Sequence, residues 1–317
     1  MAKVSLFLRI SLSKKLNGFS FFDMGKNDKE YFDDKENIYI AQDYYENTLK
    51  PVISDLLKLK DKIKVNLSIG GVALDMFSAH VPEALKLIRE FADSKNVELV
   101  GEPHHNSISY LFSEAEFKEQ VKLHVSTLEK HFNKKPLIFR NTDYSFSEVV
   151  ESNLNGFEGI IVAEYVDSNK VYKTKTGKAV LIRSSQLVRV TQDINVLAFD
   201  IEYLLNEDYQ SALQHIVGKH EFLFGSEMAK LASEEFKQSG TSKLTNNIQN
   251  SALKELVKLE HKVKATQNKV HVDNWRQLCN FEYYLNMSDE NISNDPSAYE
   301  VFINYVTVLK DLDTKLS

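Results

Sequence analysis

The sequence contains one cysteine, Cys279, in 317 residues, which excludes an internal disulfide and a multi-cysteine metal site. It also lacks any apolar run close to the roughly 20 residues that a membrane-spanning helix requires. The formal charge is −6, so there is no excess of basic residues. A nucleic-acid partner favours a basic surface. We therefore expect neither a nucleic-acid partner nor a location in the membrane.

No leader peptide is recognisable at the N-terminus. The short apolar stretch at residues 4–10 ends in polar residues, and no small-residue cleavage site follows it. A cytoplasmic location is therefore the expectation. There is also no internal repeat, low-complexity tract or Gly/Ser linker. The length suits one large α/β domain or a barrel with a small second domain.

The first two-thirds of the chain alternate between short apolar strands and amphipathic helices. Alternation of this kind is typical of a parallel sheet, either closed into a barrel or open. Beyond residue 204 almost everything is predicted to be helical, apart from polar breaks near 238–247 and 288–297. Strands are predicted at 4–10, 63–69, 97–100, 136–139, 159–163 and 196–199, with short β-like runs at 171–174, 179–182 and 187–190. Helices are predicted at 36–60 with a break at Pro51, and at 74–93, 112–132 and 146–153.

Charged side chains follow several of these strands. Asp200 and Glu202 come directly after residues 196–199, and a strand period of two would point both carboxylates to one side. Glu102 follows the strand at 97–100, Arg140 the strand at 136–139, and Glu164 the strand at 159–163. Carboxylates gathered at one end of a sheet indicate acid/base or glycosyl chemistry.

The histidine pair after Glu102, and Arg140, each have alternative interpretations. His104 and His105 suggest a metal pair with Glu102 and Asp200, although the side chains of adjacent residues diverge and rarely bind one ion. Arg140 either clamps a carboxylate of the site or is the structural partner of Glu102 or Asp143.

Blocks of sequence spread along nearly the whole chain, in order, resemble one known family, glycoside hydrolase family 57, in its α-amylase-like branch. The resemblance implies an irregular seven-stranded parallel (β/α) barrel over residues 1–240 and a helical region over 241–317 packed on the barrel. The blocks are Gly18-Phe-Ser-Phe-Phe-Asp-Met-Gly25, Val65-Asn-Leu-Ser-Ile-Gly-Gly-Val-Ala-Leu74, Phe139-Arg-Asn-Thr-Asp143, Gly156-Phe-Glu-Gly159, Trp275-Arg-Gln-Leu278, Tyr283-Tyr-Leu-Asn-Met287 and Tyr299-Glu-Val-Phe-Ile-Asn-Tyr305.

The first two catalytic motifs of that family match poorly. Its first motif is His-Gln-Pro, and the matching residues are Ser11, Leu12 and Ser13. Its second motif is a glutamate followed four residues later by histidine. Here Glu102 is kept, but the histidine position is Asn106.

The catalytic pair of the family is only half retained. The acid/base aspartate matches Asp200, and Glu202 beside it is also kept, whereas the nucleophile position falls on Ala163. Glu164 lies one residue later, and a shift of one residue along a strand turns a side chain to the opposite face. A β-bulge would be needed to bring Glu164 back toward Asp200.

The resemblance therefore implies an α-glucan-related protein, with a maltooligosaccharide or longer glucan as ligand and no cofactor. We expect it to be catalytically silent or impaired, acting as a partner of an active glycosidase. Two alternatives remain: a retaining glycosidase that uses Glu164 as nucleophile and Asp200 as acid/base, and metal-assisted hydrolysis. The oligomeric state is not encoded. Further candidates for contact with substrate are Glu102, His104, His105, Asn106, Arg140, Asp143, Glu202 and Trp275, and candidates for sugar stacking are Tyr144, Tyr165, Tyr203 and Trp275.

Overall fold

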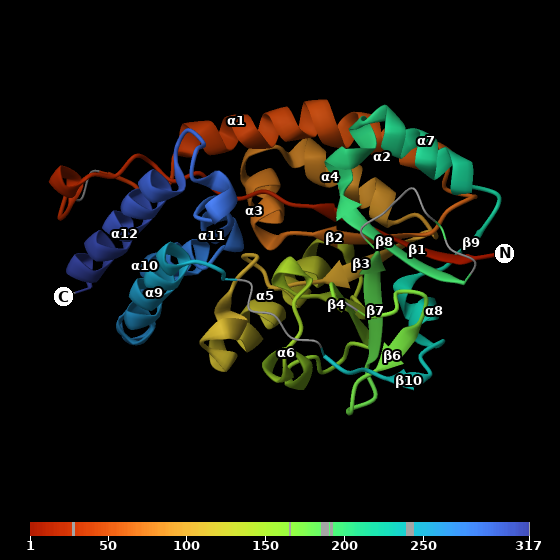
Figure 1. The fold of residues 1–317 in the computed structure, drawn as a ribbon. Coiled ribbons are helices and arrows are strands. Elements are labelled where there is room, and N and C mark those ends of the chain that lie inside the picture. Colours follow the sequence, from red (N-terminus) through yellow and green to blue (C-terminus); the bar gives the residue numbers. More distant parts are fainter. Residues whose placement is uncertain (27–28, 165, 185–189, 191–192, 239–243, 317) are drawn as a thin grey trace. The chain divides into compact units, whose positions relative to one another are not determined.

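A computed structural model describes residues 1–26, 29–164, 166–184, 190, 193–238 and 244–316 (Figure 1). Its centre is a closed barrel of seven parallel strands. Every neighbouring pair is parallel, and β8 bonds both β7 and β1, which closes the ring. This confirms the seven-stranded barrel and decides against an open sheet. The strands are β1 (Lys3–Ile10), β2 (Val65–Ile69), β3 (Val97–Gly101), β4 (Ile138–Arg140), β5 (Gly159–Val162), β7 (Ala179–Ser184) and β8 (Ile194–Asp200).

Helices follow most of the barrel strands, as the alternating pattern predicted. The helix predicted at 36–60 is interrupted just before Pro51, where a break was expected, and the helix predicted at 74–93 is also divided. A π-helical turn at Tyr45–Leu49 separates α1 from α2, with Pro51 in the first turn of α2, and Val81 separates α3 from α4, which begins at Pro82. Proline lacks the N–H of a helix interior but fits the first turn. The helices are α1 (Asp34–Tyr44), α2 (Lys50–Lys58), α3 (Gly71–His80), α4 (Pro82–Ala92), α5 (Glu114–Phe132), α6 (Glu148–Ser152), α7 (Glu207–Ile216) and α8 (Gly225–Ala229).

Short strands extend the barrel sheet. The strand β6 (Val171–Lys173), which the sequence predicts, runs antiparallel to β7. The strands β9 (Glu221–Phe222) and β10 (Glu234–Glu235) pair with β1 and β6. The prediction that almost everything beyond residue 204 is helical was wrong for these two strands, because two residues are too few to establish a period. The run predicted at 187–190 falls largely outside the described residues.

The barrel strands bury both faces, and alternate residues divide between two apolar clusters. One cluster joins Leu6, Leu8 and Leu197 to side chains of α2, α3 and α4, so it lies between the strands and the helices. The other cluster takes the intervening residues, among them Phe7 and Ala198, and fills the inside of the barrel. This alternation decides which polar side chains point inward at the strand ends.

The N-terminal end of the barrel is closed by α8. The backbone N–H of Gly225 donates to Asn66 Oδ1 at 2.6 Å. A Cβ atom at Gly225 would come within 2.8 Å of Ile138 and 2.9 Å of Phe7, so only glycine lets the helix approach this closely. Chemistry inside the barrel is therefore restricted to its other end.

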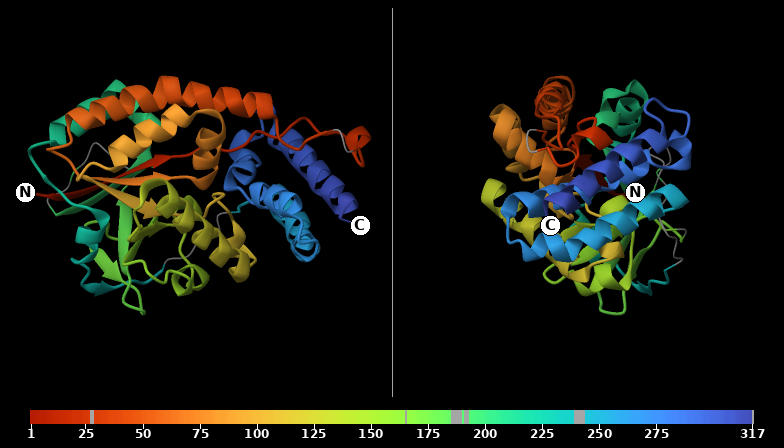
Figure 2. Two further views of the ribbon diagram at one scale, coloured as in Figure 1. Left: turned by 180° about the vertical axis from the view of Figure 1, so that it is seen from behind. Right: turned by 90° about the vertical axis from the view of Figure 1, so that its left-hand side faces the viewer.

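The chain forms two compact units. The first comprises residues 1–12, 38–104 and 118–240, which include the barrel, and the second comprises residues 13–37, 105–117 and 241–317. In the second unit α9 and α12 lie side by side (Figure 2). Its helices are α9 (Asn247–Ala265), α10 (Lys269–Leu278), α11 (Phe281–Asn286) and α12 (Ala298–Lys315). In the part of the chain that the structure describes, no helix has both the length and the apolar character needed to cross a membrane.

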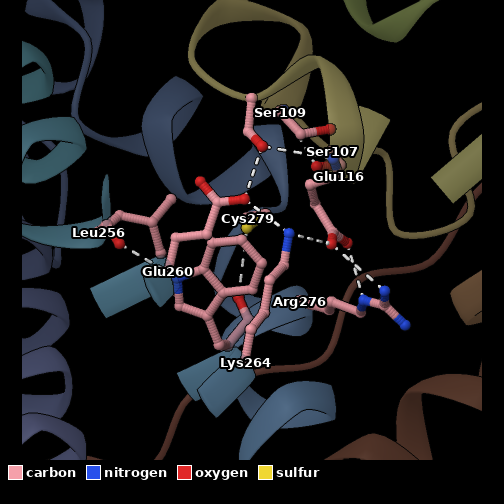
Figure 3. Close-up of polar contacts among 10 residues, drawn as sticks. Ser107, Ser109, Glu116, Leu256, Glu260, Lys264, Arg276 and Cys279 are labelled. Atoms are coloured by element: carbon pink, nitrogen blue, oxygen red, sulfur yellow. Dashed lines mark hydrogen bonds and ion pairs between the residues drawn. The ribbon is translucent and has the colours of Figure 1, made fainter. Parts of the chain in front are cut away.

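A buried carboxylate holds the helices of the second unit together (Figure 3). Glu116, which is fully buried, accepts hydrogen bonds from Arg276 Nε at 2.7 Å and Nη2 at 3.2 Å. Lys264 Nζ lies 3.1 Å from the same carboxylate and 2.6 Å from Glu260. Because a buried charge is tolerated only when it is paired, these contacts fix the start of α5 against α9 and α10.

We expect Glu116→Gln to lower the free energy of unfolding by about 3 kcal/mol, since it leaves Arg276 and Lys264 without their buried counter-ion. Glu119→Gln, an exposed change on the same helix, is the matched control and should stay within about 0.5 kcal/mol of wild type. Urea unfolding at pH 7 measures both variants. Equal stabilities would contradict a structural role for the Glu116 contacts.

Candidate functional site

The C-terminal mouth of the barrel is lined by charged side chains that point inward. Following the alternation from Phe7 and Ala198, the next inward residues on β1 and β8 are Arg9 and Asp200, which are register partners. Arg9 Nη1 lies 3.6 Å from Asp200 Oδ1. On β3 the residue after the strand is Glu102. The sequence analysis identified Asp200 and Glu102 but missed Arg9, which is enclosed in an apolar run.

Glu102 is a buried carboxylate of the mouth that accepts several hydrogen bonds. Its side chain is fully buried, and Oε2 accepts hydrogen bonds from Ser68 Oγ, Arg140 Nε at 3.1 Å and Arg140 Nη2 at 2.7 Å. Burial alone would raise the pKa of Glu102, but the guanidinium groups of Arg140 and Arg9 outweigh it and lower the pKa to about 2. The structure thus pairs Arg140 with Glu102, one of the two structural partners considered from the sequence.

His124 supports Glu102 from α5 and was missed by the sequence analysis. Its Nδ1 accepts a hydrogen bond from the Glu102 backbone N–H at 3.1 Å, and Nε2 lies 2.8 Å from the Ile69 carbonyl. This arrangement assigns the proton to Nε2 in the neutral ring. Burial lowers the pKa of His124 to about 4, despite the opposing effect of the Glu102 carboxylate. The only sequence signal is a polar residue on the buried face of an amphipathic helix.

A strained turn follows Arg140 at the end of β4 and leads toward the end of β5. Asp143 and Tyr144 both have left-handed backbone angles, with φ of 52° and 54°. Such angles are unfavourable for residues with a Cβ and persist only where the surroundings enforce them. The amide of Asn141 stabilises the turn by donating to Ser145 O at 3.2 Å and Oγ at 3.1 Å.

The same turn positions Tyr144 and Ala163. The Ala163 backbone N–H donates to the Tyr144 carbonyl at 2.9 Å. The Tyr144 ring lies against two guanidinium groups, with its centroid 4.4 Å from Arg183 Cζ and 5.3 Å from Arg140 Cζ. Tyr144 is buried, so its role here is to orient the two arginines. Arg183, on β7, was not identified from the sequence.

Ala163 follows β5 directly and packs against the apolar cluster inside the barrel, as does Ile161 two residues earlier. In the β5–β7 register the last pair is Val162 and Ile182, and Ala163 and Arg183 are the residues that directly follow them. Glu164 is half-buried and lies beyond the end of β5, so the alternation of the strand does not define the direction of its side chain.

Asp200 is the last residue of β8, and Glu202 lies in a 3₁₀ turn, Ile201–Leu205. The strand period of two therefore does not apply to Glu202, and the prediction that it points to the same side as Asp200 has no basis in the strand. Tyr44 Oη donates to Glu202 Oε2 at 2.9 Å. Partial burial, and to a smaller extent the neighbouring Asp200 carboxylate, raises the pKa of Glu202. Tyr203, another stacking candidate, is exposed, and Tyr165 falls outside the described residues.

The adjacent histidines make separate contacts. In the first unit His104 Nε2 lies 2.9 Å from Asp75 Oδ2, and any side chain at Gly71 would collide with the His104 ring. In the second unit His105 Nε2 lies 3.6 Å from Asp273 Oδ1. Among the residues that the structure describes, no three His, Cys, Asp or Glu side chains are grouped to hold a metal ion.

Two other candidates, Asn106 and Trp275, lie in the second unit. Asn106 has a left-handed φ of 50°, and its side-chain amide lies 3.4 Å from Asn280 Oδ1. Trp275 is fully buried, and its Nε1 donates to the Leu256 carbonyl at 3.1 Å.

The sequence model of glycosyl hydrolase family 57 matches residues 15–234, more than half of the chain. The chain belongs to glycosyl hydrolase family 57. A protein named "Putative alpha-amylase" from Methanocaldococcus jannaschii is 27% identical over 170 residues, which are 50% of this chain and 36% of that protein. The match thus spans about a third of that relative's length.

Solved structures from this family share the fold at low sequence identity. A family 57 branching enzyme from Thermococcus kodakaraensis superposes with a TM-score of 0.71 at 11% identity, over 99% of this chain and 90% of the enzyme. The 4-alpha-glucanotransferase of Thermococcus litoralis gives a TM-score of 0.67 at 12% identity, over 89% of this chain and 56% of the enzyme.

His124 provides a pH-dependent test of the geometry at Glu102. Its folded pKa is about 4 and its ordinary value 6.5, so the unfolded chain takes up a proton first as the pH falls. The free energy of unfolding should therefore decrease as the pH is lowered from about 6.5 to about 4, and His124→Asn should flatten that part of the profile. The Glu102 carboxyl affects stability at lower pH, between its ordinary pKa of 4.5 and its folded pKa of about 2.

Urea unfolding across this pH range measures the slope for wild type and variant. Nitrogen chemical shifts of the histidine rings in the folded protein give a second readout, and they should report a neutral His124 protonated on Nε2 at pH 6. A His124 ring that is already charged at pH 6 would contradict the assignment.

Proposed function

We propose that this protein acts in α-glucan metabolism as a family 57 barrel whose glycosidase centre is silent or strongly impaired. Family membership supports the glucan part of the proposal, together with the relatives named as an alpha-amylase, a branching enzyme and a 4-alpha-glucanotransferase. In this proposal it binds a maltooligosaccharide or longer glucan, or works beside an active glycosidase, without hydrolysing the glucan itself.

The observation that carries the proposal is the residue at the end of β5. A retaining glycosidase places two carboxyl groups about 5–5.5 Å apart, one as nucleophile and one as acid/base. The resemblance aligns the nucleophile with Ala163, whose side chain packs against the inner cluster of the barrel. A methyl group cannot attack an anomeric carbon. Glu164 lies one residue beyond that position, and would have to be turned toward Asp200 to replace it.

The surroundings of Asp200 support the same conclusion. Its ion-pair partner in the mouth is Arg9, at 3.6 Å, while the residue that the resemblance aligns with the nucleophile is Ala163. Further support comes from Ser11, Leu12 and Ser13, which stand where the family has His-Gln-Pro. These departures affect separate segments of the chain, so an error in the alignment of one of them would not restore the site.

The test is the release of reducing ends from maltoheptaose and soluble starch. We expect wild type to stay within the background set by Asp200→Ala and Glu164→Ala, because the mouth lacks a correctly placed nucleophile. Hydrolysis by wild type that both substitutions abolish would overturn the proposal and assign Glu164 as nucleophile. Binding of maltoheptaose by calorimetry, run on the same samples, tests the glucan part separately.

A further inference from the structure

Three guanidinium groups lie in the inner mouth of the barrel, those of Arg9, Arg140 and Arg183. We propose that the mouth binds a sugar bearing an oxyanion, a phosphate or a carboxylate, and that Arg183 contacts this anion directly. The inference deepens the proposed function, since it concerns the ligand of the same site and rests on Ala163 leaving that site without a nucleophile.

Two of the three arginines already have a carboxylate partner. Arg140 makes two hydrogen bonds to Glu102, both to the same oxygen. Arg9 faces Asp200 across the β1–β8 ladder. Both residues are therefore ion-paired within the mouth, which distinguishes them from Arg183.

Arg183 is held rigidly by groups that carry no negative charge. Its Nε donates to the Ala198 carbonyl at 2.9 Å, and its guanidinium lies 4.4 Å from the centre of the Tyr144 ring. Within the described part of the chain no carboxylate pairs with Arg183. The residues that follow it, 185–189 and 191–192, include no aspartate or glutamate in the sequence.

The position of Arg183 is that of an anion receptor within the site. Ala163 directly follows Val162, the residue that pairs with Ile182, just as Arg183 directly follows Ile182, and the alanine side chain brings no carboxylate to this end of the two strands. The ring of Tyr144 also contacts Arg140, so a second guanidinium lies close to Arg183. An anion bound to Arg183 would be attracted to both groups.

The chemistry of the guanidinium group limits the ligand. With Nε bonded to Ala198, the terminal nitrogens are the donors that remain, and a planar guanidinium pairs best with two oxygens of a carboxylate or phosphate. A neutral glucose hydroxyl offers no such pair. The class of ligand is therefore a sugar phosphate or a uronic acid.

Isothermal titration calorimetry on the full chain tests this inference with α-glucose 1-phosphate, glucuronate, glucose, maltoheptaose and inorganic phosphate. We expect at least one of the two anionic sugars to bind with a Kd at least tenfold lower than glucose, and to weaken as salt is raised. Arg183→Gln should raise that Kd at least tenfold. Arg183→Lys keeps the charge but loses the planar fork, and should restore only part of the affinity.

Lys60→Gln, which removes an exposed cation elsewhere on the barrel unit, is the matched control and should leave the Kd unchanged. Anionic sugars that bind no better than glucose, or that bind Arg183→Gln as tightly as wild type, would overturn the inference. Inorganic phosphate that binds as tightly as the sugar phosphate would overturn the sugar part. Thermal melting of each variant identifies any loss of folding.

These outcomes separate the inference from the proposed function. Binding of maltoheptaose without binding of either anionic sugar would leave the glucan proposal intact and reject the anion site. Binding of an anionic sugar that depends on Arg183, in a protein that also hydrolyses maltoheptaose, would support the anion site and reject the silent centre.

Discussion

The buried ion pair between Glu102 and Arg140 is the constraint on which the mouth of the barrel depends. Both side chains are almost completely removed from solvent, and an isolated charge in that position would be strongly destabilising. The pair is therefore surrounded by groups that complete it: Ser68 donates to the same carboxylate oxygen, and His124 fixes the backbone at Glu102. The turn after Arg140 then determines where β5 ends, because its Tyr144 carbonyl holds the Ala163 N–H.

Much of the fold followed from the sequence because strand and helix periods are local. Six of the seven barrel strands were predicted as strands and the seventh, at 179–182, as a short β-like run, while the count of seven came from the family resemblance. The positions of Glu102, Arg140 and Asp200 at strand ends were also predicted. Arg9 was missed because the residue that gives it meaning, Asp200, lies at the far end of the barrel sequence and meets it only when β8 closes on β1. His124 was missed because its partners, the backbone groups of Glu102 and Ile69, lie far from it in the sequence, after β3 and at the end of β2.

Other errors had local causes. The helix predicted over residues 74–93 is divided into α3 and α4, because Pro82 fits the first turn of a helix and not its interior. The strand period was extended to Glu202, although the chain turns immediately after Asp200. In both cases the apolar pattern continues past the point where the backbone changes, so periodicity alone does not locate the boundary.

Along the barrel axis, the apolar residues that stabilise the fold and the ion pairs of the mouth lie in different layers. The N-terminal end is closed by α8, the middle is an apolar cluster, and the ion pairs of Arg9 with Asp200 and of Arg140 with Glu102 lie at the mouth. Ala163, which the resemblance aligns with the nucleophile, packs against this apolar cluster. The proposed loss of the nucleophile and the proposed anion site at Arg183 would therefore both depend on this one residue.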